Sequence, residues 1–303
     1  MENIPNKFKS KSSLKYPNYV SGPMIEEYFY DYFNKNKLIS NRTYLPIFWT
    51  NYYIINNYGK NINDLKEYIK KLDKNKRYFT IVQHARGILC DVSHLDILIF
   101  SSSGAGRNPR NFKINGVFKY DSNNNNLCDI HIPLLANPAL KYNNIDKTIL
   151  CSFMGNLNNC QNVRKIMYEK LHNKKGFIIQ NSSNFNNYYN MLCKSLFSLC
   201  PRGVGMSSFR MYESLHCLAI PIYIYDDIEM LPYKDEITWE KISIIIKENE
   251  IDKIPDILEK ISKNEINEYQ NNIKNLLDKY FTLDGTCKYI YNKLITADTK
   301  KQI

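Results

Sequence analysis

The order of apolar and polar residues divides the chain into segments typical of alternating helices and strands. Apolar residues recur at helical spacing over 24–35 and 62–72, which predicts a helix in each range. Short runs rich in aromatic and β-branched residues predict strands, and these runs cover 45–49, 78–83, 96–100 and 129–133. The first half of the chain is therefore expected to mix both kinds of element.

The pattern changes near residue 146, where continuous apolar runs alternate with amphipathic segments. The runs predict buried strands at 148–154, 176–180, 196–200 and 220–225, and the segments between them predict helices at 160–172, 185–194 and 207–218. Such an alternation is typical of a parallel sheet covered by helices on both faces. The chain from Trp239 onwards is expected to be mostly helical, with helices over 254–261 and 266–294.

These elements predict an α/β protein with four parts. Residues 1–22 are expected to form an N-terminal arm, 23–145 a first domain, 146–265 a Rossmann-like domain, and 266–303 a C-terminal helix. The length of 303 residues allows two domains, and an aromatic content of 13% excludes disorder of the whole chain.

Cysteine usage and hydropathy indicate a cytoplasmic protein. The eight cysteines include no Cys-x-x-Cys pair and stand mostly in apolar strings, so we expect reduced, buried thiols rather than a zinc site or a disulfide framework. No apolar run reaches 18 residues, and residues 1–11 lack the apolar segment of a signal peptide. We therefore predict neither a transmembrane segment nor secretion.

The net charge of +11 is compatible with binding to nucleic acid, to an acidic membrane or to a phosphorylated small molecule. The excess consists mostly of dispersed lysines, without an Arg-rich block or an RNA-binding motif. Asn, Lys, Ile and Tyr are all abundant, as in proteins encoded by AT-rich genomes such as those of large DNA viruses. The charge alone therefore identifies no partner.

Two loops follow predicted strands at the edge where open α/β sheets bind ligands. Gly155 leaves the first strand, and Arg164 lies in the helix after it. The second loop joins a strand end to a helix start and contains Arg202, Gly203, Ser207 and Ser208. Free N–H groups and the positive end of the helix dipole at such a position are suited to bind a phosphate group.

The helix after the second loop places Arg210 and Glu213 on one face, opposite its apolar face. An arginine can neutralise a diphosphate, and a carboxylate can accept hydrogen bonds from both ribose hydroxyls. The same spacing is also that of an ordinary surface ion pair, which contributes little to stability. The spacing leaves both interpretations open.

The residues around these loops resemble a known family. The similarity to the signature of the exostosin-type glycosyltransferases (glycosyltransferase family 47) is carried by Ser195–Gly203, Ser208-Phe-Arg210-Met-Tyr-Glu213, Ile220–Asp226, Leu231-Pro232 and Ile237-Thr-Trp239. Upstream, Phe153-x-Gly155 with Arg164 resembles that family's F-x-G…R element, and Asp129-x-x-x-Pro133 resembles its D-x-x-x-P strand. The resemblance covers 129–262, and the family's N-terminal motif is not recognisable.

The resemblance implies a GT-B-like fold, with two Rossmann-like domains whose parallel sheets face a central cleft and a last helix that returns to the first domain. It implies a hexosyl- or pentosyltransferase that moves a sugar from a nucleotide sugar, a UDP-sugar, to a glycan or another hydroxyl acceptor. The transfer is expected to invert the configuration at the anomeric carbon and to need neither a metal nor a further cofactor. The implied donor-binding residues are Gly155, Arg164, Arg202, Gly203, Ser207, Ser208, Arg210 and Glu213.

The first domain must supply the acceptor side and any general base, because inverting transfer requires a group that deprotonates the attacking hydroxyl. His84 directly follows the strand at 78–83, and the ordinary pKa of a histidine, about 6.5, suits this role. Asp96 and His94 are alternative bases, and Arg86 is a candidate for acceptor binding. Each of these residues is also compatible with a purely structural role.

A second interpretation is a non-catalytic basic protein that keeps a nucleotide-binding fold and binds nucleic acid or a membrane surface. It accounts for the charge of +11 but not for the glycine loop with Arg210 and Glu213. Under the enzyme interpretation no nucleic-acid partner is expected, and peripheral membrane contact stays open. Asp226 and Asp227 are adjacent rather than spaced as Asp-x-Asp. We therefore interpret them as part of a turn or a helix cap, and no metal site is expected.

Overall fold

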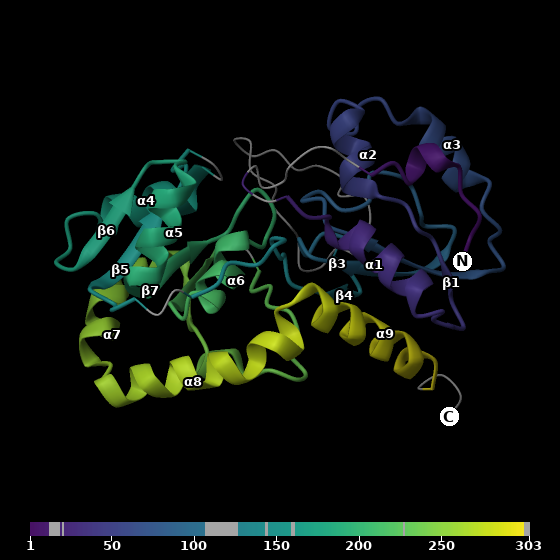
Figure 1. Cartoon of the computed structure of the whole chain (residues 1–303). Coiled ribbons are helices and arrows are strands. Elements are labelled where there is room, and N and C mark those ends of the chain that lie inside the picture. The colour runs from purple at the N-terminus through teal and green to yellow at the C-terminus, as the bar shows by residue number, and fades with distance from the viewer. Residues whose placement is uncertain are drawn as a thin grey trace. The chain divides into compact units, whose positions relative to one another are not determined.

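A computed structural model describes residues 1–11, 19, 21–106, 127–142, 145–158, 161–226 and 228–299 (Figure 1). Within these residues the chain forms two compact units. The first contains 1–106, 127–138 and 279–299, and the second contains 139–278. The predicted boundary at 145/146 therefore lies at 138/139, and residues 266–278 belong to the second unit rather than to a separate C-terminal part.

The first unit is built on a parallel sheet in the order β1-β2-β3-β4. Its elements are η1 (Asn6–Phe8), α1 (Ile25–Lys35), β1 (Thr43–Tyr44), α2 (Trp49–Ile55), α3 (Asn63–Lys70), β2 (Arg77–Val82), β3 (Asp96–Ser101), β4 (Ile130–His131) and α9 (Leu283–Thr299). The strand expected at 45–49 is wrong, because Pro46 has no N–H to continue the ladder and a helix begins at Trp49.

The described part of the predicted N-terminal arm packs on the first unit. Ile4 and Phe8 are buried among the side chains of its core. The Phe48 N–H donates to the Phe8 carbonyl at 2.9 Å, and the Lys7 ammonium pairs with Asp64 at 2.5 Å. Residues 1–11 are therefore part of the domain, and 12–18 and 20 lie outside the described residues.

The second unit is built on a parallel sheet in the order β6-β5-β7-β8-β9. Its elements are β5 (Ile149–Met154), α4 (Gln161–Leu171), β6 (Phe177–Gln180), α5 (Phe185–Lys194), β7 (Ser195–Pro201), α6 (Phe209–His216), β8 (Ile220–Tyr225), η2 (Trp239–Lys241), β9 (Ile244–Lys247), η3 (Glu248–Lys253), α7 (Ile254–Lys260) and α8 (Lys263–Tyr280). The α/β class with two parallel sheets is thus confirmed.

The helix predicted over 266–294 is two helices, α8 and α9. The break falls at Thr282, whose hydroxyl accepts a hydrogen bond from the Gly285 N–H at 3.0 Å and so caps α9. In Figure 1 α9 runs beside α1, and the Tyr28 hydroxyl at α1 donates to Asp284 at 2.9 Å. Helix α9 therefore belongs to the first unit.

Candidate functional site

The carboxyl ends of β5, β7 and β8 lie at one edge of the second sheet, because the three strands are parallel neighbours. Gly155 follows β5, Arg202 follows β7 and Asp226 follows β8. Helix α6 begins after the loop at 202–208, so Arg210 lies in its first turn. The sheet and one helix start thus bring together residues that are far apart in the chain.

Two guanidinium groups lie over the ring of Phe153 at this edge. The guanidinium carbon of Arg210 is 4.3 Å from the ring centroid, and that of Arg164 is 5.6 Å from it. Arg164 also donates to the carbonyls of Asn156 at 2.8 Å and of Arg202 at 3.3 Å. We call Phe153, Gly155, Arg164, Tyr188, Arg210 and Glu213 the arginine cluster.

Arg210 lies in the centre of the arginine cluster and is only 9% exposed. Its Nη2 donates to the Met154 carbonyl at 2.6 Å, and its guanidinium also lies 4.8 Å from the ring of Tyr188. Its Nε has no hydrogen-bond partner, and it makes no ion pair within the described part of the chain. A buried cation without a counter-charge is unfavourable, so this side chain is suited to bind an anion.

Glu213 is buried rather than exposed, since α6 is covered on all sides. Its Oε2 accepts a hydrogen bond of 2.5 Å from the Tyr188 hydroxyl. The surface ion pair that the sequence left open for Arg210 and Glu213 is therefore wrong. The sequence also missed Tyr188, because it stands in α5 outside any motif and only the fold brings it to α6.

The loop between β7 and α6 is held by its own backbone and by a buried ion pair. Arg202 is 2% exposed, and its Nη1 lies 2.8 Å and 3.1 Å from the two Asp226 oxygens. The Gly203 N–H donates to the Ser207 carbonyl at 3.0 Å. Asp226 thus pairs with Arg202, and the turn or helix-cap interpretation missed this contact.

The two serines at the start of α6 have different surroundings. Ser207 is buried, with its hydroxyl 3.4 Å from that of Tyr212. Ser208 is the N-cap residue of α6, but its side chain makes no capping hydrogen bond. Both precede Arg210 within one helical turn of the chain, so the predicted donor-binding residues of the second half gather at one sheet edge.

His84 follows β2 in the first unit, as predicted. Its ring packs edge-on against Tyr53, with centroids 5.1 Å apart, and its Nδ1 accepts a hydrogen bond of 3.3 Å from the Arg86 N–H. Burial, with a smaller contribution from the Arg86 charge, lowers the pKa of His84 to about 3. A ring that binds a proton so weakly is poorly suited to be a general base near neutral pH.

Asp96 opens β3 and therefore lies at the amino edge of the first sheet, opposite the edge that carries His84. Its oxygens lie 2.8 Å from Arg42 Nη1 and 3.4 Å from Arg77 Nε. His94 Nε2 lies 3.3 Å from the Ile69 carbonyl. The structure does not bring the two predicted catalytic residues together, and Asp96 serves an ion-pair network because a strand start faces away from the ligand edge.

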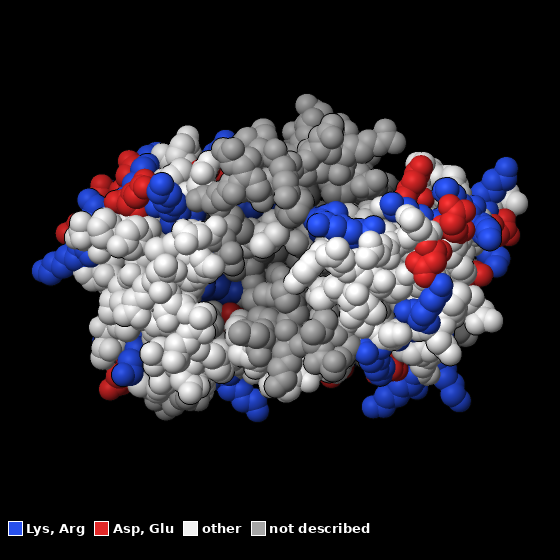
Figure 2. Space-filling model, turned by 90° about the horizontal axis from the view of Figure 1, so that it is seen from above, with Lys and Arg blue, Asp and Glu red and all other residues white. Residues whose placement is uncertain are grey.

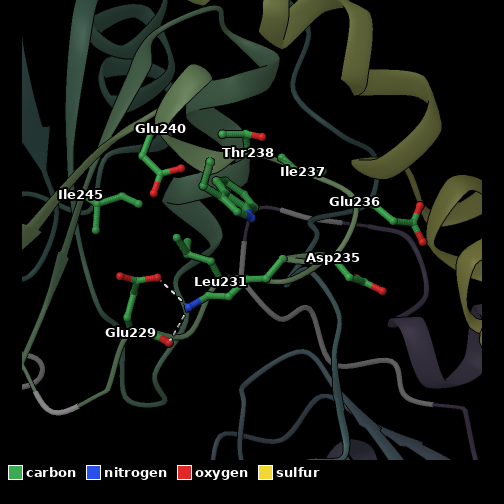
Figure 3. Close-up of a pocket in the computed structure, with 10 residues that line it drawn as sticks. Glu229, Leu231, Asp235, Glu236, Ile237, Thr238, Glu240 and Ile245 are labelled. Atoms are coloured by element: carbon green, nitrogen blue, oxygen red, sulfur yellow. Dashed lines mark hydrogen bonds and ion pairs between the residues drawn. The ribbon is translucent and has the colours of Figure 1, made fainter.

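A hollow of about 360 Å³ lies in the segment between β8 and β9 (Figure 3). Leu231, Trp239 and Ile245 contribute apolar surface, and the lining contains four carboxylates and the ammonium of Lys234. That ammonium is paired with Glu229 at 2.6 Å. A diphosphate would meet an excess of negative charge here, so the arginine cluster is the better candidate for phosphate binding.

Among the described residues, no group of three or more His, Cys, Asp or Glu side chains is arranged to hold a metal ion. None of the helices in the described part of the chain combines the length and apolar character that crossing a membrane requires.

Comparison with known proteins gives matches that each cover about a third of this chain or less. The Exostosin-1 homolog of Caenorhabditis elegans is 32% identical over 93 residues, which are 31% of this chain and 24% of that protein. The probable glucuronosyltransferase 47 A of Physcomitrium patens is 36% identical over 88 residues, 29% of this chain and 19% of that protein. The matched stretches thus span a quarter or less of these relatives' own length.

Among solved structures, the crystal structure of TarM aligns with a TM-score of 0.40 and 11% identity, covering 77% of this chain and 58% of that one. The family model for the exostosin GT47 domain matches residues 106–261, just over half of the chain. This range contains the whole arginine cluster. The chain therefore belongs to the exostosin GT47 domain family.

Proposed function

We propose that this chain is a glycosyltransferase that moves a sugar from a nucleotide sugar, a UDP-sugar, to a hydroxyl group of a glycan or a similar acceptor. The observation that carries the proposal is Arg210, a buried guanidinium at the carboxyl edge of a parallel sheet without a counter-charge in the described residues. A diphosphate would supply that charge. Arg164, which lies over the same Phe153 ring, would share it.

Further parts of the proposal concern the ribose, the stereochemistry, the metal requirement and the acceptor. Glu213 binds the ribose hydroxyls, because a carboxylate accepts several hydrogen bonds at once. The transfer inverts the configuration at the anomeric carbon. It requires no metal, since the arginines stabilise the charge that develops on the leaving diphosphate. Arg86 binds the acceptor. Relatives named glucuronosyltransferases make a UDP-glucuronic acid donor the first to examine.

The alternative is a basic nucleotide-fold protein that binds nucleic acid or a membrane surface, which the net charge of +11 favours. On the face shown in Figure 2, however, the described Lys and Arg side chains are interspersed with Asp and Glu. A mixed surface of this kind lacks the continuous basic stripe that tracks a nucleic-acid backbone. The enzyme proposal explains the arginine cluster, and the alternative does not.

The test is a thermal-shift panel of UDP- and GDP-sugars beside short DNA and RNA, followed by calorimetry and transfer assays. Arg210→Ala and Glu213→Ala should each weaken UDP binding, Arg210→Ala by on the order of 2–5 kcal/mol. Lys165→Ala, an exposed cation next to Arg164 on α4, is the matched control and should bind like the parent. Stabilisation by nucleic acid alone, with UDP and GDP affinity unchanged in both cluster variants, would reject the proposal.

A further inference from the structure

Tyr188 touches two of the three charged side chains of the arginine cluster, Arg210 and Glu213, although no sequence motif includes it. Its hydroxyl donates to Glu213 Oε2 at 2.5 Å, and its ring lies 4.8 Å from the guanidinium carbon of Arg210. It is 8% exposed and comes from α5, whereas its two partners come from α6. One side chain thus connects two helices at the point where the charges lie.

The start of α5 fixes where Tyr188 lies. The Asn184 side chain caps the helix by accepting a hydrogen bond from the Asn187 N–H at 3.0 Å, and the Tyr188 N–H donates to the Asn184 carbonyl at 3.0 Å. Tyr188 therefore stands in the capped first turns of a helix that packs on β5 and β7. The helix thus fixes the backbone of Tyr188, and the contacts with Glu213 and Arg210 hold its side chain.

The contacts of Tyr188 separate two charges that would otherwise attract each other. Arg210 and Glu213 are three residues apart on one helix, a spacing that allows an ion pair. The carboxylate instead accepts a hydrogen bond from the phenol, and Arg210 forms no ion pair within the described residues. A carboxylate held in this way keeps lone pairs for further donors, and the guanidinium keeps its charge for an anion.

We infer that Tyr188 is a positioning residue that sets Arg210 toward the diphosphate and Glu213 toward the ribose, and that its hydroxyl makes the site selective for ribonucleotides. This inference rests on the proposed function. Without the hydroxyl, Glu213 loses the hydrogen bond that holds it away from Arg210, which weakens recognition of the ribose diol. Without the ring, Arg210 also loses the aromatic face that holds its guanidinium.

The experiment compares the affinities of UDP, 2′,3′-dideoxy-UDP and pyrophosphate by calorimetry. Tyr188→Phe removes only the hydroxyl, so the preference for UDP over the dideoxy compound should fall roughly 10-fold, as for loss of one hydrogen bond to a charged group. Pyrophosphate affinity should also fall in that variant, because Glu213 can pair with Arg210, but it should fall less, because Arg164 keeps its place over Phe153. Tyr188→Leu should weaken both, because it also removes the ring.

Tyr189→Phe is the matched control, since it loses a hydroxyl at the next position of α5 that binds the Lys141 carbonyl instead. It should keep the parent's preference, and urea unfolding checks that all variants fold. If Glu213→Ala loses the ribose preference while Tyr188→Phe keeps it, the inference is overturned and the proposed function stands. A parent protein that binds neither UDP nor pyrophosphate would overturn both.

Discussion

A Cβ atom on Gly155 would lie 2.7 Å from Nη2 of Arg210, closer than two such atoms can pack. The glycine's backbone torsion is not in the left-handed region, so its role is to leave space for the guanidinium, which a side chain here would displace. The absence of a side chain lets the guanidinium reach the Met154 carbonyl at 2.6 Å. Gly155 thus fixes where Arg210 can lie.

We therefore expect Gly155→Ala to displace the guanidinium and to weaken UDP binding roughly 10-fold, as for loss of one charged hydrogen bond. The measurement is calorimetry in a double-mutant cycle with Arg210→Ala. If Gly155 acts through Arg210, the alanine should add nothing in the Arg210→Ala background. Equal losses in both backgrounds would show that Gly155 acts by another route.

The pair of Arg202 and Asp226 should act on stability. Asp226→Ala leaves a 2% exposed guanidinium without this carboxylate, and breaking a buried pair in this way costs about 3–5 kcal/mol. Urea unfolding measures the loss. The control is Asp252→Ala, which removes an exposed ion pair with Lys170 and should leave the unfolding midpoint unchanged. Equal midpoints for the two variants would contradict the structural role.

The strands that the sequence predicted best are those with continuous apolar runs. The run at 220–225 is β8, with the predicted bounds, because its residues are buried on both faces and no other element competes for them. The run that ends at Lys247 forms β9, which we missed because the surrounding chain has helical composition. Its identity as a strand depends on pairing with β8, which is a long-range contact.

The candidate site could be predicted from the sequence only in part. The glycine and arginine positions follow strand ends, so their arrival at one edge follows from parallel topology. The surroundings of Arg210 could not be foreseen, since Phe153 and Tyr188 reach it from 57 and 22 positions away. Periodicity placed Glu213 on an exposed face, but α5 covers that face and buries it.

Removal of metal should not abolish transfer. The positive charge of Arg164 and Arg210 lies where we place the leaving diphosphate, so no divalent ion is needed to stabilise it. Activity measured after dialysis against EDTA should stay within a few-fold of the untreated enzyme. Loss of activity that Mn²⁺ or Mg²⁺ restores would contradict this expectation and direct attention to Asp226.

Glu26 should make stability depend on pH. Its carboxyl is buried at the end of β2, where it accepts hydrogen bonds from the Gln83 N–H at 2.7 Å and the Thr50 hydroxyl at 2.8 Å. Burial outweighs these donors, and the nearby Glu27 adds to it, so the pKa of Glu26 is raised from 4.5 to about 8. The protonated form is therefore favoured in the folded state more than in the unfolded state.

The sign of the effect follows from this shift. The contribution of protonated Glu26 to the free energy of unfolding is complete below pH 4.5 and is lost as the pH rises through about 8. The total loss is up to about 5 kcal/mol. Thermal unfolding between pH 5 and pH 9 should show the parent losing stability relative to Glu26→Gln, which cannot ionise. Because glutamine changes the hydrogen bonds, the slope with pH is compared and not the absolute stability. Parallel curves would contradict the raised pKa.

The last prediction concerns His84, which the sequence favoured as the general base. A base must accept a proton on a free ring nitrogen, but Nδ1 already accepts the Arg86 N–H at 3.3 Å, which places the ring proton on Nε2. The lowered pKa of about 3 means that the ring stays neutral from pH 5 upwards. We therefore expect His84→Ala to slow turnover by less than about 10-fold, whereas loss of a true base would cost roughly 10²–10⁴-fold.

The pH profile separates the two roles of His84 more sharply than a single rate does. If His84 only packs against Tyr53, its removal lowers the unfolding temperature, and the acid limb of kcat/KM keeps the same midpoint in parent and variant. If His84 is the base, the limb itself disappears with the side chain, because the group that titrates has been removed. A lost limb, together with turnover slowed by roughly 10²-fold or more, would restore His84 as the base, and a parent limb near neutral pH in kcat/KM would show that its pKa in the free enzyme is well above about 3.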